Sequence, residues 1–109
     1  MATTYKVLGQ SNPAATTATT LYTAPAATQA VVSTIVICNQ TATAATFRIS
    51  VRPAGAAQTA AMYVAYDVTV GASDSTALTL GITLGATDVI TVYGSTATLS
   101  FTAFGSEIA

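Results

Sequence analysis

Apolar and polar residues alternate along most of this chain with a period of two. In the segment 46–52, Phe47, Ile49 and Val51 fall on one face, and the polar residues between them fall on the other. Three further segments alternate in the same way, with the apolar sets Met62, Val64, Tyr66, Val68 and Val70; Leu78, Leu80, Ile82 and Leu84; and Ala97, Leu99, Phe101 and Ala103. A helix would need apolar residues three and four positions apart, so the pattern predicts strands with one apolar face, and Phe47, Phe101 and Tyr66 are expected in the core.

Turn-forming residues divide the chain into about eight short strands. The predicted strands are 3–9, 19–23, 29–39, 45–53, 61–70 with a break near Asp67, 76–84, 88–93 and 96–104, followed by a tail over 105–109. Short strands with turn signals at about every 8–12 residues are typical of an antiparallel sandwich or a small barrel. We predict an all-β fold: an antiparallel β-sandwich, jelly-roll or Greek-key-like, that forms a single domain over residues 1–109.

The segment from Val31 to Cys38 differs from the other strands because both of its faces are largely apolar. A continuous apolar run indicates burial on both faces. Only one face of a sheet packs on the core of a two-layer sandwich, so we expect a loop or another subunit to cover the other face of this strand. Cys38, the only cysteine, is predicted to be a buried and unreactive thiol.

Charged residues are scarce. Three Lys/Arg and four Asp/Glu make up 6% of the 109 residues and leave a net charge of −1, whereas about a quarter of a typical soluble domain is charged. A surface with so little charge does not keep small proteins apart, so we expect other subunits to cover much of it. The sequence lacks the Lys/Arg cluster that a nucleic-acid-binding protein would need, so we expect no nucleic-acid partner. No apolar stretch is long enough for a membrane helix, so we expect no membrane partner. The alternation of polar and apolar residues in Met1–Gly9 is unlike the apolar segment of a signal peptide.

The sequence offers few groups for catalysis. It contains no histidine, which excludes Ser-His-Asp and Cys-His catalytic groups and metal sites built on histidine. The segment Gly71–Ser75 lacks the lysine and the spacing of a phosphate-binding loop. Asp67, Asp74 and Asp88 are candidates for paired-carboxylate chemistry, but aspartates between strands commonly cap turns by accepting backbone N–H groups. We therefore predict no enzyme activity, no catalytic residue, no cofactor and no metal.

Five residues are candidates for an interface. Arg48 and Arg52 lie on the polar face of one strand, where they either face solvent or clamp carboxylates of a neighbouring subunit with their planar guanidinium groups. Tyr63 is a candidate because tyrosine is enriched at protein interfaces, although the tyrosines could instead form a sugar-stacking platform. Phe104 and Ile108 fall outside or beyond the inward-facing set of the last strand and are predicted to anchor a partner.

Several stretches together resemble a group of small β-rich virion proteins of tailed bacteriophages. They are Leu21–Thr28, Val31–Asn39, Thr46–Pro53, Tyr66–Asp67 and Phe101–Ile108, and the likeness covers nearly the whole chain from about Tyr5. The resemblance implies a non-enzymatic virion component, assembled in the host cytoplasm, that is either a capsid decoration (cement) protein or a small neck, tail or fibre component. A cement protein would form a homotrimer or similar cluster, bind the major capsid protein or another virion protein, and stabilise the shell through its interfaces.

Two other function classes remain open at this point. A glycan- or receptor-binding module at the particle surface would need aromatic and polar residues that converge in loops. An ice-binding surface is the other, because Thr-x-Thr triplets occur at 17–19, 41–43 and 96–98. The triplets lie in or beside predicted turns at irregular intervals, whereas ice matching needs a regular repeat on one flat face.

Overall fold

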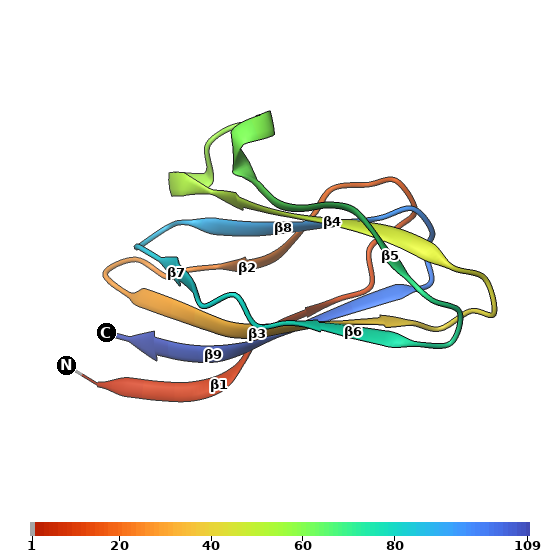
Figure 1. The fold of residues 1–109 in the computed structure, drawn as a ribbon. Coiled ribbons are helices and arrows are strands. Elements are labelled where there is room, and N and C mark those ends of the chain that lie inside the picture. Colours follow the sequence, from red (N-terminus) through yellow and green to blue (C-terminus); the bar gives the residue numbers. More distant parts are fainter. Residues whose placement is uncertain (1) are drawn as a thin grey trace.

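The computed structural model describes residues 2–109, which form two antiparallel sheets packed face to face (Figure 1). The prediction of an all-β sandwich is confirmed. Its elements are β1 (Thr3–Ser11), β2 (Thr19–Thr23), β3 (Gln29–Asn39), β4 (Ala45–Arg52), two 3₁₀ turns η1 (Pro53–Gly55) and η2 (Ala60–Met62), β5 (Tyr63–Val70), β6 (Ser75–Leu78), β7 (Ile82–Leu84), β8 (Val89–Gly94) and β9 (Leu99–Ile108). No helix within residues 2–109 has the length and apolar character needed to cross a membrane.

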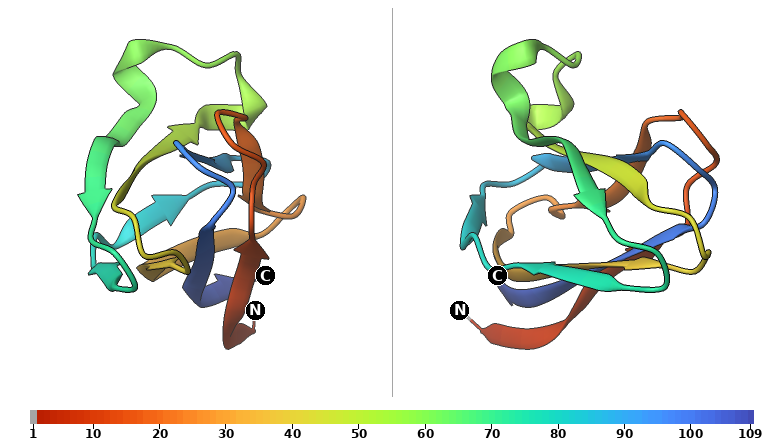
Figure 2. Two further views of the ribbon diagram at one scale, coloured as in Figure 1. Left: turned by 90° about the vertical axis from the view of Figure 1, so that its right-hand side faces the viewer. Right: turned by 45° about the vertical axis from the view of Figure 1, so that its right-hand side comes forward.

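The strand order is that of a jelly roll. One sheet, the β1 sheet, runs β1-β9-β3-β6 with β7 also paired to β3, and the other, the β2 sheet, runs β2-β8-β4-β5. β6 and β7 pair with opposite ends of β3 and are two halves of one interrupted strand. Counting them as one turns nine strands into eight, in the orders 1-8-3-6 and 2-7-4-5, which is the eight-stranded jelly-roll arrangement. Figure 2 shows the two layers from further sides.

The core lies between the two sheets. Phe47 on β4 meets Phe101 on β9 edge to face, with ring centroids 6.1 Å apart and ring planes at 76°. Both rings are fully buried, together with Ile35, Ile37, Ile49, Leu84, Ile90 and Leu99. The alternation predicted for β4 and for 99–103 is therefore confirmed, whereas Ala97 is exposed in the turn before β9.

β5 does not follow the single-faced pattern predicted for 62–70. In its pairing with β4, β5 has one extra residue between Ala65 and Val68 and another between Tyr63 and Ala65. β5 therefore contains two β-bulges. Each bulge moves the following side chains to the other face of the sheet. Ala65 and Val70 face the core, while Tyr66 is 56% exposed. The prediction that Tyr66 lies in the core was wrong for this reason, whereas the break near Asp67 is confirmed by its φ of 52°.

The segment 76–84 is not one continuous strand. Gly81 has a φ of 62°, a left-handed conformation that interrupts the strand between β6 and β7. Leu80, predicted on the apolar face, is exposed as a result.

The last strand extends beyond the predicted end at residue 104. Gly105 was interpreted as the start of a tail, but it pairs with Lys6 on β1 and with Val32 on β3. A Cβ atom at Gly105 would stand 2.0 Å from the carbonyl oxygen of Val31. This glycine therefore permits a close approach of two strands instead of ending one.

The outer side of β3 is only partly covered. Val32, Ile35 and Ile37 face the core and are fully buried. Val36 and Cys38 lie on the opposite side and are half-buried, so the prediction of a fully buried Cys38 was wrong. Both pair with residues of β6 and β9, whose side chains border but do not enclose them. Coverage of this side by another subunit stays a prediction.

Candidate functional site

The five predicted interface residues lie on two opposite faces of the sandwich. Arg48 and Arg52 lie on the outer face of the β2 sheet, because they alternate along β4 with residues that pack on the core. Tyr63 lies on the same face, because it pairs with Ser50, which stands between the two arginines on β4. Phe104 and Ile108 lie on β9, on the outer face of the β1 sheet. The structure therefore offers two surfaces: one charged and aromatic, the other uncharged with exposed apolar side chains.

Arg48 is the centre of the first surface. Its guanidinium group binds the Asp67 carboxylate at two points, Nε to Oδ1 at 2.7 Å and Nη2 to Oδ2 at 3.3 Å. Its Cζ atom also lies 4.2 Å from the ring centroid of Tyr66 and 4.4 Å from that of Tyr93. The hydrogen bonds to Asp67 raise the pKa of Arg48 above its ordinary value. The guanidinium group is therefore fixed as a cation between two aromatic rings.

The bulge in β5 explains why these groups meet. Phe47 pairs with Val68 and Ile49 pairs with Ala65, so both Tyr66 and Asp67 lie opposite Arg48. A regular ladder would place only one residue there. Sequence reasoning missed Tyr66 as a surface residue, although the predicted break at Asp67 was the signal that the alternation changes face.

Arg52 organises the loop between β4 and β5. Its Nε donates to the carbonyl oxygen of Ala56 at 2.7 Å, its Nη2 to that of Gly55 at 2.9 Å, and its Nη1 to Thr91 Oγ1 at 3.4 Å. Both arginines thus use their guanidinium groups within the chain. A contact from either to a neighbouring subunit stays a prediction.

Further hydrogen bonds hold the same loop over the β2 sheet. Ser50 Oγ, which is buried, donates to Gln58 Oε1 at 2.6 Å. The backbone N–H of Ala54 donates to Asp88 Oδ1 at 2.8 Å. The other oxygen of Asp88 accepts the N–H of Gly85, and Asp74 accepts that of Ser75. The turn-capping prediction is therefore confirmed for Asp74 and Asp88, whereas the Asp67 carboxylate pairs with an arginine.

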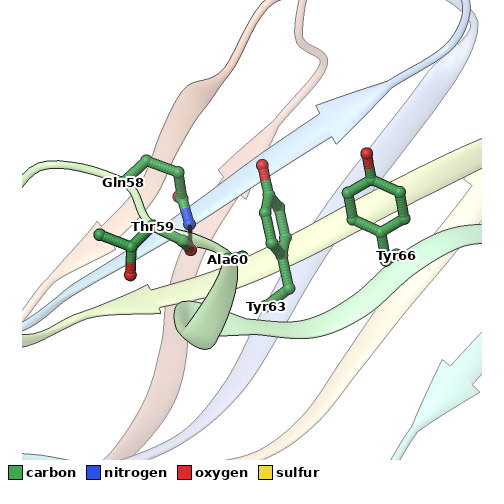
Figure 3. A pocket seen from close by; sticks show the side chains of 5 residues that line it. All are labelled: Gln58, Thr59, Ala60, Tyr63 and Tyr66. Carbon is green, nitrogen blue, oxygen red and sulfur yellow. Dashed lines mark hydrogen bonds between the residues drawn. The ribbon is translucent and has the colours of Figure 1, made fainter.

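A pocket of about 410 Å³ opens between this loop and β5. Gln58, Thr59, Ala60, Tyr63 and Tyr66 line it (Figure 3). The two tyrosine rings stand 4.9 Å apart at 85°. Figure 3 shows them side by side with both hydroxyl groups pointing the same way. The volume of the pocket is within the range of about 300–1,000 Å³ that is usual for small-molecule sites.

The second surface, the outer face of the β1 sheet, presents exposed apolar side chains among Ser and Thr residues and carries no charged side chain. Tyr5 is 82% exposed, Val7 48% and Phe104 39%. Val7 and Phe104 are direct partners across β1 and β9. Ile108, further along β9, pairs with Thr3 and is half-buried.

Lys6, the cation on β1, is turned away from this face. Its Nζ lies 2.7 Å from Glu107 Oε1, and Glu107 Oε2 accepts a hydrogen bond from the hydroxyl of Tyr22 on β2. Burial and then the bond to Glu107 raise the pKa of Tyr22, while Lys6 and then Tyr22 lower the pKa of Glu107. The hydrogen-bonded group of Lys6, Glu107 and Tyr22 connects the two sheets at one edge.

Within residues 2–109, no three His, Cys, Asp or Glu side chains gather closely enough to hold a metal ion. Comparisons of the chain with protein-family models, curated proteins and solved structures found no match.

Proposed function

We propose that this protein is a non-enzymatic structural component of a tailed-bacteriophage virion and that it acts as a capsid decoration (cement) protein. In this role it forms a homotrimer or similar cluster and binds the major capsid protein or another virion protein. It stabilises the shell through the area and shape of its interfaces.

The observation that carries the proposal is the outer face of the β1 sheet, which exposes large apolar side chains among Ser and Thr residues and carries no charged residue. Tyr5, Val7 and Phe104 are exposed on it, and Val36 and Ile108 are half-buried there. The outward face of an antiparallel sandwich usually carries polar and charged residues. None of the seven charged residues lies on this face. Two lie on the inner side at the sheet edge, three on the β2 sheet and two in turns: Lys6 and Glu107; Arg48, Arg52 and Asp67; Asp74 and Asp88. A partner that covered the face would remove apolar surface from water without burying a charge.

The jelly-roll topology adds support by analogy. Eight-stranded double-sheet jelly rolls recur in viral capsid and lectin domains. A fold alone does not decide a function, so the weight of the proposal rests on the uncovered face, the scarcity of charge and the resemblance to small virion proteins.

Quantitative mass spectrometry of purified, washed virions tests the role. A decoration protein should be present in many copies per particle, in a fixed ratio to the major capsid protein. A few copies per particle would move it to the neck, tail or fibre. Its absence from washed particles would overturn the proposal.

Sedimentation equilibrium of the isolated chain tests the proposed surface. We expect the wild type to associate and the Phe104→Ser variant to remain monomeric. Val64→Thr is the matched control, because Val64 is exposed to a similar degree on β5, away from this face. Equal association of all three proteins would show that the β1-sheet face is not the self-association surface.

A further inference from the structure

The pocket beside β5 presents aromatic rings that are held firmly in place. The Arg48 guanidinium, 4.2 Å from the Tyr66 ring centroid, supports that ring, and the Tyr66 ring in turn meets the Tyr63 ring at a right angle. Figure 3 shows the Tyr63 ring nearly edge-on, between Tyr66 and the Gln58–Ala60 segment. One ring face of Tyr63 is therefore turned toward the loop, across the pocket.

The loop that forms the opposite wall is also fixed. Arg52 holds the carbonyl groups of Gly55 and Ala56, and Ser50 holds the side-chain amide oxygen of Gln58. The Gln58 amide nitrogen donates to the carbonyl oxygen of Thr59 at 2.9 Å. A site whose walls are already ordered loses little conformational entropy when a ligand binds.

Three of the five lining side chains carry hydroxyl groups. Among residues 2–109, no hydrogen bond engages the hydroxyl of Thr59, Tyr63 or Tyr66, in contrast to the bonded hydroxyl of Tyr22. A ligand with an apolar ring face and a polar edge can stack on a tyrosine and bond to these hydroxyls at the same time.

The pocket carries no free charge. Its five lining residues are uncharged, and the nearby Arg48 cation is already paired with Asp67 at 2.7 Å. An anionic ligand would lose its hydration without gaining an ionic partner, so the site favours a neutral ligand.

From this combination we propose that the Tyr63–Tyr66 pocket binds a neutral pyranose unit of a glycan. A pyranose presents C–H groups on its faces and hydroxyl groups at its edge, which suits a pocket with an aromatic wall and unpaired tyrosine hydroxyl groups. A proline-rich peptide is the competing aromatic ligand, but it needs an extended groove lined by several rings. Here only two rings, at 85° to each other, line one open pocket beside the loop. This site is independent of the virion role, since it lies on the β2 sheet and not on the outer face of the β1 sheet.

The test begins with the intact chain on an array of neutral and acidic glycans, with a proline-rich peptide as a parallel probe. Neutral glycans that bind are then titrated into ¹⁵N-labelled protein. We expect binding of neutral glycans, with amide shift changes concentrated in residues 58–66. Binding of acidic glycans or the peptide only, shift changes centred on the β1 sheet, or no glycan binding at millimolar concentration would each overturn the proposal.

Two tyrosine variants then assign the contact. Loss of one stacking ring costs about 1.4 kcal/mol, so Tyr63→Ala should weaken binding about tenfold. Tyr5→Ala removes an exposed tyrosine from the opposite sheet and should leave the affinity unchanged. Circular dichroism of both variants checks that they fold. If Tyr63→Ala does not fold, the amide shift changes of the wild-type protein show whether the glycan binds at residues 58–66. Equal affinity of a folded Tyr63→Ala variant and the wild type would contradict the proposal.

Discussion

Arg48 and Asp67 form a two-point ion pair across the β4–β5 ladder, with Nε 2.7 Å from Oδ1 and Nη2 3.3 Å from Oδ2. The pair exists because a β-bulge places both Tyr66 and Asp67 opposite Arg48. The same guanidinium supports the Tyr66 ring that lines the pocket. One backbone irregularity thus provides an ion pair, a cation–π contact and a wall of the proposed binding site.

A double-mutant cycle should detect this pairing. Arg48→Ala and Asp67→Ala should each lower the free energy of unfolding, and the double variant should lose less than the sum of the two. The non-additivity should shrink at high salt because the pair is partly exposed. Urea unfolding at low and high salt measures it. Arg52→Ala is the control, since Arg52 shares no contact with Asp67 and its effect should add to that of Asp67→Ala.

Gly105→Ala should destabilise the protein strongly. The new Cβ atom would stand 2.0 Å from the Val31 carbonyl oxygen, a backbone atom that cannot move without shifting β3. We expect a loss of about 3 kcal/mol, the upper end of the usual cost of overpacking. Chemical denaturation measures the loss.

Gly81→Ala is the matched control for Gly105→Ala. Gly81 has a φ of 62° but no atom near its would-be Cβ, so only the left-handed conformation is penalised. We expect a loss of about 1 kcal/mol. Equal losses at the two positions would show that β3 and β9 do not approach as closely as described.

Asn39→Ala should be costly because Asn39 connects several loops at one end of the sandwich. Asn39 is 2% exposed, and its side chain donates to Thr43 O at 2.9 Å and Gly71 O at 3.2 Å and accepts the Thr41 N–H at 3.2 Å. Leaving such buried groups unsatisfied costs about 1–3 kcal/mol. The exposed Asn12, which donates to the carbonyl groups of Ala97 and Leu99, is the control. Thermal unfolding should show a clearly larger loss for Asn39→Ala than for Asn12→Ala.

Glu107 should make stability sensitive to acid. Lys6 and Tyr22 lower its pKa in the folded protein, so the carboxylate stabilises the fold above the unfolded-state value of about 4.3. This contribution is lost as the pH falls through the lowered folded-state pKa. Glu107→Gln should therefore be less stable than the wild type at neutral pH and lose less stability on acidification below about pH 4. Urea unfolding across this range measures both slopes, and parallel slopes would contradict the assignment.

The alternation of residues determined much of the architecture without tertiary information. The bounds of β2 and β3 match those expected, because turn residues end both strands and β-branched residues fill β3. Burial of Phe47, Ile49 and Phe101 follows directly from their period of two.

Tertiary structure decided the positions where one strand had to adapt to another. Gly105 continues β9 because β3 approaches its backbone, and the bulges of β5 arise from its pairing with β4. Side-chain alternation assumes a regular ladder, and each extra residue reverses it. The sequence alone placed Arg48 and Arg52 on one face. That Arg48 meets Tyr66 and Asp67 of its own chain, and that Tyr63 borders a pocket, depends on a register that is set only when the strands pair.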